Sequence, residues 1–287
     1  MIWEIYAFIG TIALSLAYII EKRSLIETHP LQFATVLAMF SVILSIFIIP
    51  FVDIGSLNIQ LVLLIYIDSW GWAIGGWYLI KAIRHMQLSS TTPLLNFSPA
   101  FVAIAAFIFL NEVITTRQIF GIGLLVIGTY ILETHNKESL LHPFKETFKS
   151  KYTRYIFISI FVSAAASILD KYLLGFISSF TLIFVIQIFL LVNFLMIMYH
   201  FQKTLKPMKL GLKNAGIWIF LVAALIIIKR VTIAHAMSIT HVSLVVAITQ
   251  LSTLFTVLMG GEIFHEKNLF KKSIATIIMI AGVFLII

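Results

Sequence analysis

Charged residues inside apolar segments are the groups of this sequence that could do chemistry. An ionised side chain in hydrocarbon costs at least about 2.5–3.5 kcal/mol, so it normally faces a water-filled cavity, pairs with another charge or extends to an interface. Residues on the walls of a cavity could bind a charged or polar solute. The charged residues in or at the ends of apolar segments are Glu21, Lys22, Arg23, Asp68, Lys81, Arg84, Asp170, Lys171, Lys229 and Arg230.

The pair Lys229 and Arg230 is the clearest of these candidates. It follows an apolar stretch from Ala215 to Ile228 that is too short to span a bilayer, and the apolar residues continue through Ala236. A spanning helix needs about 20 residues, so the pair should lie within the membrane thickness. We expect both residues to bind substrate in a cavity; extension to the interface is the alternative.

Two acid–lysine pairs, Glu21-Lys22 and Asp170-Lys171, occur at the same depth of their segments. Neighbouring residues diverge by about 100° on a helix, so each acid must find a partner other than the adjacent lysine. We expect Lys22 and Lys171 to bind substrate, with anchoring at the interface as the alternative. For Glu21 and Asp170 we expect a role in gating or pairing.

The third and fourth apolar segments add further candidates. We expect three of their residues, Asp68, Trp72 and Lys81, to bind substrate. The aromatic ring of Trp72 can stack on an organic solute or a cation. An interfacial aromatic belt is the alternative for this tryptophan. Pro93 and Pro99 interrupt the helical hydrogen bonds of the fourth segment. They are expected to take part in gating, and a kink that serves only packing is the alternative.

Several function classes are excluded or disfavoured. The chain has no Cys, which excludes thiolate catalysis and Cys-ligated metals. The group Glu262, His265 and Glu266 departs from the spacing of a zinc motif, so we expect no metal and no cofactor. Basic residues do not form one face with interleaved aromatics, which argues against nucleic-acid binding. No nucleophile–base arrangement is recognisable, so an enzyme is not expected.

The composition predicts an all-α integral membrane protein. Of the 287 residues, 61% are hydrophobic and 11% are charged, against about 45–50% and about 25% in soluble domains. Apolar runs long enough for transmembrane helices can be marked ten times. They cover residues 4–25, 31–50, 59–80, 90–110, 117–132, 153–174, 179–200, 215–237, 243–263 and 271–287.

The chain divides into two similar halves. A polar connecting loop, 133–152, separates a first five-helix repeat, 1–132, from a second, 153–287. A shift of 149 residues lays Glu21 on Asp170 and Lys22 on Lys171, and a shift of 154 lays Ser89 on Ser243 and Glu112 on Glu266. Five crossings are an odd number, so the second repeat should be inverted with respect to the first.

The distribution of basic residues predicts an orientation. They gather in the loops after the fifth, seventh and ninth segments, for example at Lys145, Lys206 and Lys271. By the positive-inside rule these loops are cytoplasmic, which places both termini outside the cytoplasmic membrane.

The ends of the two halves carry a duplicated pattern. It reads Glu112-(x8)-Gly121-(x6)-Gly128 in the first half and Glu266-(x8)-Ala275-(x6)-Gly282 in the second. With ten helices in two halves, this resembles the EamA-type transporters of the drug/metabolite transporter superfamily. Thr253 departs from the pattern, because the family has a proline there. Family members usually have cytoplasmic termini, opposite to the charge distribution here.

The resemblance implies secondary transport of a small organic metabolite through a central cavity. Together with the charges described above, it leads us to expect alternating access and a polar, zwitterionic or anionic substrate such as an amino acid. The expected partners are this substrate and the lipid bilayer; a coupling ion or proton is left open, as is the oligomeric state. A lipid or lipid-linked substrate translocase is the alternative, followed by an intramembrane enzyme.

Overall fold

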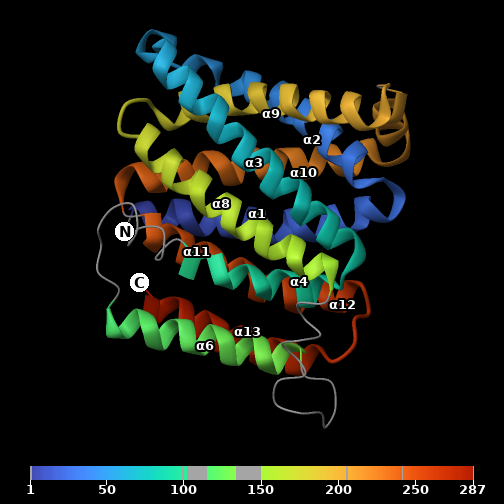
Figure 1. Ribbon diagram of the computed structural model, residues 1–287, viewed down its shortest axis with the longest axis vertical. Coiled ribbons are helices and arrows are strands. Elements are labelled where there is room, and N and C mark those ends of the chain that lie inside the picture. The colour runs from blue at the N-terminus through green and yellow to red at the C-terminus, as the bar shows by residue number, and fades with distance from the viewer. Residues whose placement is uncertain are drawn as a thin grey trace.

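The residues that the structure describes are helical and contain no strand. The computed structural model describes residues 2–98, 100–101, 115–133, 150–204, 206–240 and 242–286. Figure 1 shows a stack of long helices, some of which run diagonally across the others. The expectation of an all-α protein is confirmed for this part of the chain.

The helices follow the apolar segments of the sequence. The first half contains α1 (Ile2–Glu27), α2 (Pro30–Ser45), η1 (Ile46–Phe51), η2 (Ile54–Ser56), α3 (Ile59–His85), α4 (Leu88–Leu94), η3 (Leu95–Phe97) and α6 (Thr116–Glu133). The second half contains α8 (Lys151–Leu173), α9 (Ser179–Gln202), α10 (Lys206–Ile239), α11 (Val242–Phe255), the π-helical turn η4 (Thr256–Gly260), α12 (Gly261–Ile263) and α13 (Leu269–Ile286).

Six helical segments within the described residues are long and apolar enough to cross a membrane. They are Trp3–Glu27, Pro30–Phe51, Ile59–His85, Lys151–Leu173, Ser179–Gln202 and Lys206–Ile239. Exposed apolar side chains such as Phe47, Phe161 and Phe201 cover their outer faces. Such surfaces suit contact with lipid tails, so the chain is a multi-pass membrane protein.

Three predicted segments differ from the helices observed. The second begins as expected, with Pro30 in the first turn after the His29 cap, but α2 ends at Ser45 and continues as the 3-10 helix η1 around Pro50. The eighth starts as expected at a kink at Ala215 (φ −141°, ψ 21°), but a shorter helical stretch that begins at Lys206, with Pro207 in its first turn, precedes this kink within α10. The ninth is divided by η4.

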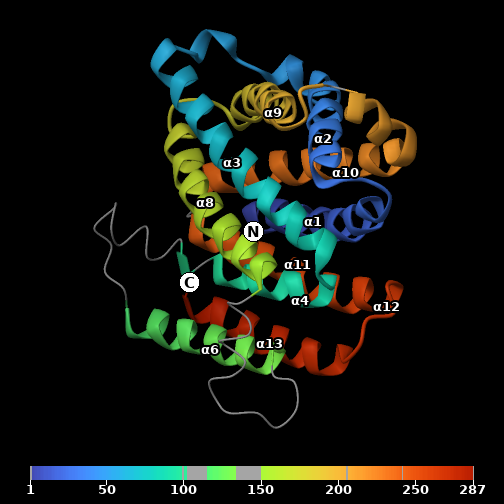
Figure 2. The ribbon, with the colours of Figure 1, turned by 45° about the vertical axis from the view of Figure 1, so that its right-hand side comes forward.

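Helices of the two halves pack against each other in a reciprocal pattern. The first helix of each half contacts the third helix of the other half, as α1 contacts α10 and α8 contacts α3. The second helices follow the same rule, since α2 contacts α10 and α9 contacts α3. The last helices, α6 and α13, lie side by side at the lower edge in Figures 1 and 2.

Small residues allow the close approach of α6 and α13, as the duplicated glycine pattern suggests. A Cβ added at Gly282 would lie 2.7 Å from the backbone oxygen of Gly121 and 3.0 Å from the Cβ of Leu124. A backbone atom, unlike the end of a flexible side chain, cannot move out of such a contact by rotation about a side-chain bond. This contact therefore requires glycine at position 282.

We expect Gly282→Ala to lower the thermal unfolding temperature of the purified protein. Overpacking costs about 1–3 kcal/mol, of which the better helix propensity of alanine recovers at most about 1 kcal/mol. Gly123→Ala, on α6, is the matched control, because a Cβ there meets nothing within 4 Å. Equal unfolding temperatures of the two variants would contradict this packing.

Candidate functional site

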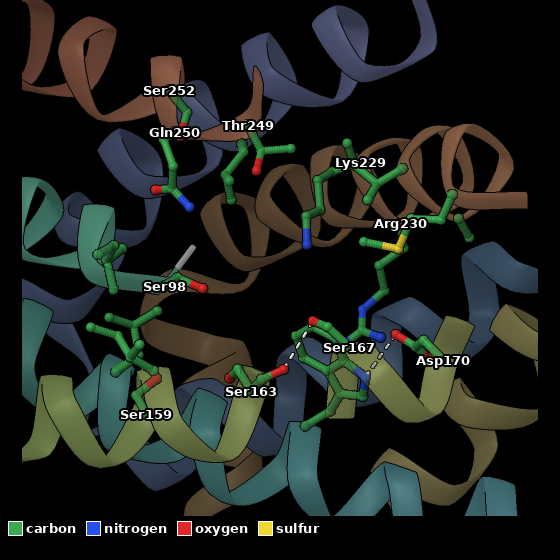
Figure 3. A pocket seen from close by; sticks show the side chains of 18 of the residues that line it. Ser98, Ser159, Ser163, Ser167, Asp170, Lys229, Arg230, Thr249, Gln250 and Ser252 are labelled. Atoms are coloured by element: carbon green, nitrogen blue, oxygen red, sulfur yellow. Dashed lines mark hydrogen bonds between the residues drawn. The ribbon is translucent and has the colours of Figure 1, made fainter. Parts of the chain in front are cut away.

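A cavity of about 170 Å³ lies at the centre of the bundle. Its walls come from α1, α3, α8, α10 and α11 and from the segment around η3 (Figure 3). An engineered cavity of about 150 Å³ holds benzene, so this space suits a small metabolite. The polar and aromatic residues on its walls are Tyr18, Trp72, Ser98, Ser159, Ser163, Ser167, Asp170, Lys229, Arg230, Thr249, Gln250, Ser252 and Thr253.

Lys229 and Arg230 contribute two positive charges to this central cavity. Both approach the ring of Trp72, with the Lys229 Nζ 5.5 Å and the Arg230 Cζ 4.8 Å from its centroid. Figure 3 shows the Lys229 ammonium pointing into the open space and the Arg230 guanidinium reaching towards Asp170. The cavity therefore offers cations and an aromatic face on one side.

Asp170 supplies negative charge to the same wall. Its Oδ2 accepts a hydrogen bond of 3.2 Å from the Trp72 Nε1, and the charges of Arg230 and Lys229 act on it. Asp68 lies on α3 four residues before Trp72, and its carboxyl group interacts with that of Asp170. The structure thus brings together five of the residues that the sequence singles out: Asp68, Trp72, Asp170, Lys229 and Arg230.

Hydroxyl and amide groups complete the cavity, and the sequence analysis did not identify them. Ser159, Ser163 and Ser167 follow one another at intervals of four on α8, so they share one face of that helix, and all three reach the cavity. Thr249 and Gln250 face them from α11. The fourfold spacing of serines in an apolar helix was a signal that could have found them.

A second cavity of about 170 Å³ adjoins the first and shares Trp72, Lys229 and Arg230 with it. We call it the side cavity. Glu21 and Tyr18 of α1 and Gln187 of α9 lie on its walls. Glu21 is buried, and its Oε1 has no hydrogen-bond partner among the described residues.

The structure places Lys22 and Lys171 at helix ends, on the walls of neither cavity. Lys22 donates to the carbonyl oxygens of Ile83 and Met86, at the end of α3, both at 2.7 Å. In the same way, Lys171 donates to Met237 (2.7 Å) and Thr240 (2.9 Å), at the end of α10. Each ammonium thereby satisfies carbonyl groups that a helix end leaves free.

These two lysine caps lie at opposite ends of α1. The end of α10 is near the start of α1, where the Tyr6 and His235 rings are 4.6 Å apart. Lys22 instead lies towards the far end of α1, which is 26 residues long. The caps therefore mark opposite sides of the bundle.

Lys171→Met and Lys22→Met should each lower the free energy of unfolding. Hydrogen bonds to a charged group contribute about 1.5–3 kcal/mol, and a cation at a helix C-terminus adds a favourable dipole interaction. Thermal unfolding in detergent measures the effect. Arg23→Met is the control, because its ion pair with Glu27 (3.8 Å) is exposed and such pairs contribute about 0–1 kcal/mol. Variants no less stable than Arg23→Met would contradict the capping role.

The remaining predicted residues lie apart from the two cavities or outside the described residues. The Lys81 Nζ lies 3.5 Å from the Trp77 ring centroid and near the Tyr78 and Tyr155 rings. Pro93 is buried in α4, which passes into the 3-10 turn η3 just before Ser98 reaches the central cavity. Pro99 lies outside the described residues.

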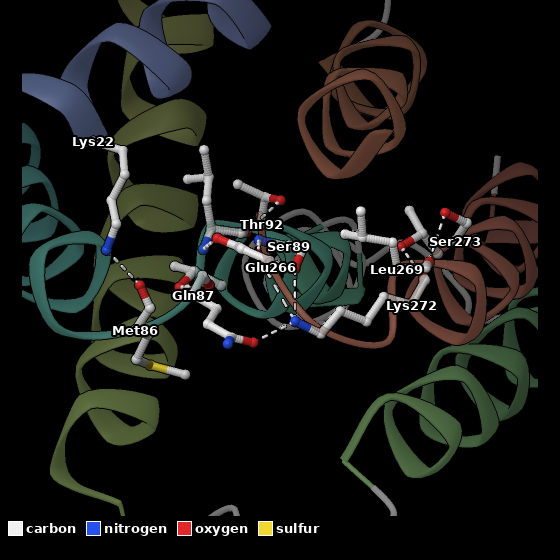
Figure 4. A network of polar contacts seen from close by, with 12 residues as sticks. Lys22, Met86, Gln87, Ser89, Thr92, Glu266, Leu269, Lys272 and Ser273 are labelled. Atoms are coloured by element: carbon white, nitrogen blue, oxygen red, sulfur yellow. Dashed lines mark hydrogen bonds and ion pairs between the residues drawn. The ribbon is translucent and has the colours of Figure 1, made fainter. Parts of the chain in front are cut away.

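A second buried polar network joins the two halves at the start of α4 (Figure 4). The Glu266 carboxylate accepts hydrogen bonds from the backbone N–H groups of Leu88 (2.6 Å) and Ser89 (2.9 Å) and from the Ser89 hydroxyl. Lys272 lies 3.7 Å from the same carboxylate and donates to the Gln87 Oε1 and the Ser89 Oγ. Glu266 therefore acts as the N-terminal cap of a helix in the other half.

The described residues contain no group of three or more His, Cys, Asp or Glu side chains that could hold a metal ion. The geometry instead defines a class: a multi-pass membrane protein with a charged, hydroxyl-lined cavity enclosed by its two halves.

Comparison with known proteins specifies the class further. Residues 1–134 match the EamA-like transporter family, which is the family that the duplicated pattern of the sequence resembles. A solved crystal structure of a protein is similar in fold, with a TM-score of 0.66 at 9% sequence identity, over 98% of this chain and 96% of that one. No curated protein matches the sequence.

Proposed function

We propose that the chain is a secondary transporter that moves a small polar organic metabolite across the cytoplasmic membrane by alternating access. The substrate class that fits best is an amino acid or a related zwitterion or anion. The observation that carries this proposal is the pair of cations, Lys229 and Arg230, on the wall of the central cavity. A buried charge needs an opposite charge, and an anionic group of the substrate would supply it.

The other walls of the central cavity suit the rest of such a molecule. The serine hydroxyls of α8 and the amide of Gln250 can both donate and accept hydrogen bonds, and the Trp72 ring offers an apolar face. Asp170 can accept a hydrogen bond from an ammonium or hydroxyl group. These groups would orient a zwitterion between the positive wall and the carboxylate.

Alternating access would follow from an inverted repeat of five helices in residues 1–132 and five in 153–287, joined by the loop 133–152. Two observations support this repeat. The lysine caps are equivalent: the shift of 149 residues relates Lys22 to Lys171, and the shift of 154 relates their acceptors Ile83 and Met86 to Met237 and Thr240. The helix contacts are also equivalent: exchange of the two halves turns the contact of α1 with α10 into that of α8 with α3. Two such halves around one site can open in turn to either side.

The test is thermal stabilisation of the purified protein by a panel of amino acids, organic acids, amines and nucleotide derivatives, followed by uptake of the best ligand into proteoliposomes. A ligand that binds only the native state raises the unfolding temperature as its concentration increases. We expect a carboxylate-containing compound to stabilise the protein and to be taken up. Stabilisation by amines alone, or by lipids alone, would contradict this proposal, and the latter result would favour lipid translocation.

A further inference from the structure

A pair of carboxyl groups is buried between α3 and α8, beside the central cavity. Asp68 is 1% exposed and Asp170 is 9% exposed. Both oxygens of Asp68 and the Oδ1 of Asp170 have no hydrogen-bond donor among the described residues, although the two carboxyl groups interact with each other. A buried acceptor without a donor costs about 1–3 kcal/mol, and more when it is charged. These buried oxygens therefore require a hydrogen-bond donor.

The surroundings do not supply a donor to Asp68. From α10, the charges of Arg230 and Lys229 act on Asp170, and Arg230 also acts on Asp68. Trp72 of α3 donates to the other oxygen of Asp170. From α9, the Asn193 Nδ2 donates to the Ser69 hydroxyl instead (2.9 Å). Glu21 of α1 lies on the side cavity.

We propose that Asp68 and Asp170 form a proton-binding site in which one proton is shared between the two carboxyl groups. Two carboxylates in one buried site do not both ionise readily, because like charges disfavour each other there. With one proton bound, an O–H group on Asp68 donates to the Oδ1 of Asp170, so each carboxyl group gains a partner. The pair then titrates as a unit. The proton comes from water on one side and returns to water when it leaves.

The position of this site indicates what the proton does, on the basis of the proposed transport function. With both aspartates ionised, their two negative charges balance the positive charges of Lys229 and Arg230. One bound proton leaves a net charge of +1 beside the cavity, and a monoanionic group of the substrate restores neutrality. The proton would therefore bind first and the anion second, and the site that holds both would carry the same net charge as the site that holds neither. The carrier would be a proton–anion symporter.

Infrared spectroscopy of the protein in lipid, with ¹³C-carboxyl aspartate incorporated, tests the site without any substitution. The chain contains only three aspartates, Asp53, Asp68 and Asp170, and Asp53 is exposed in the loop before η2. We expect an isotope-shifted carboxylic acid C=O band at neutral pH that is lost at higher pH, with release of one proton per chain. Absence of this band would overturn the proposal.

Substitutions assign the band to the pair. Asp68→Asn should abolish it, because Asp170 keeps Trp72 and Arg230 as partners and stays ionised. Asp170→Asn should retain a band at a shifted frequency, since Asp68 is 1% exposed and burial disfavours the charged form of a carboxyl group. Glu21→Gln should leave the aspartate band unchanged. If the band persists in Asp68→Asn, the assignment is overturned. Loss of the wild-type band on addition of NaCl at constant pH would also overturn it, because this result would indicate a sodium site.

This experiment uses no transported substrate, so its outcome is independent of the test of the proposed function. The coupling is tested separately, with the carboxylate ligand identified in the thermal panel. We expect an inwardly directed proton gradient to drive its accumulation in proteoliposomes of the wild type, and Asp68→Asn to lose that accumulation. Accumulation by Asp68→Asn equal to that of the wild type would overturn the symport.

Discussion

Lys229→Met should abolish most of the affinity for the anionic ligand that the wild type binds. Truncation of one member of a buried charge pair costs about 2–5 kcal/mol, which corresponds to a weakening of at least about thirtyfold. The physical reason is that the Lys229 ammonium lies on the walls of both cavities. In the wild type it neutralises the negative charge of the bound ligand, and the variant lacks it. The concentration dependence of the unfolding temperature measures the dissociation constant.

Lys81→Met is the matched control for this prediction. It removes the same charge from another membrane helix, but Lys81 lies on the walls of neither cavity, and its ammonium contacts the Trp77 ring. Its ligand affinity should stay within about twofold of the wild type. Arg230→Lys provides a second comparison, since it keeps the charge and loses the planar guanidinium. A Lys229→Met variant that binds as tightly as Lys81→Met would contradict the cavity as the substrate site.

Glu266→Ala should produce the largest loss of stability of any substitution considered. Removal of one partner of a buried ion pair costs about 3–5 kcal/mol, because the other charge remains buried without compensation. Here Lys272, which is 6% exposed, would lose its ion pair with Glu266, and the first N–H groups of α4 would lose their acceptor as well. The unfolding temperature and the yield of monodisperse protein measure the effect.

Two further variants distinguish a loss of stability caused by this network from one caused by any substitution near α12. Glu262→Ala replaces an exposed glutamate four residues earlier and should change stability by no more than about 0.5 kcal/mol. The double variant Glu266→Ala with Lys272→Met should be more stable than Glu266→Ala alone, because it also removes the buried cation that paired with Glu266. A double variant that is less stable than both single variants would contradict the ion pair.

The network also connects stability with the site. Glu266 caps the start of α4, and the same chain segment reaches the central cavity at Ser98 after η3. Lys22 donates to Met86, two residues before Leu88, the first residue that Glu266 contacts (Figure 4). A cap from the second half therefore holds a wall of the cavity that belongs to the first half. Variants of Glu266 that still fold should for this reason bind ligand more weakly.

Helix positions could be predicted from the sequence because the bilayer imposes simple rules. A spanning segment has to be apolar over about 20 residues and has to satisfy its own backbone. This is enough to locate α1, α3, α8 and α9. It is not enough to find the π-helical turn η4 or the short helical stretch from Lys206 to the kink at Ala215, because apolarity does not reveal local backbone geometry.

The sequence by itself determined the class of protein, the apolar helices and the candidate charges. It also contained the acid–lysine duplication, but the roles of the two members could not be read from it. Adjacent residues point in different directions on a helix, and only the packing of the neighbouring helices decides what each side chain meets. The tertiary structure thus placed Asp170 beside Trp72 and Arg230, whereas it placed Lys22 and Lys171 on carbonyl groups at helix ends.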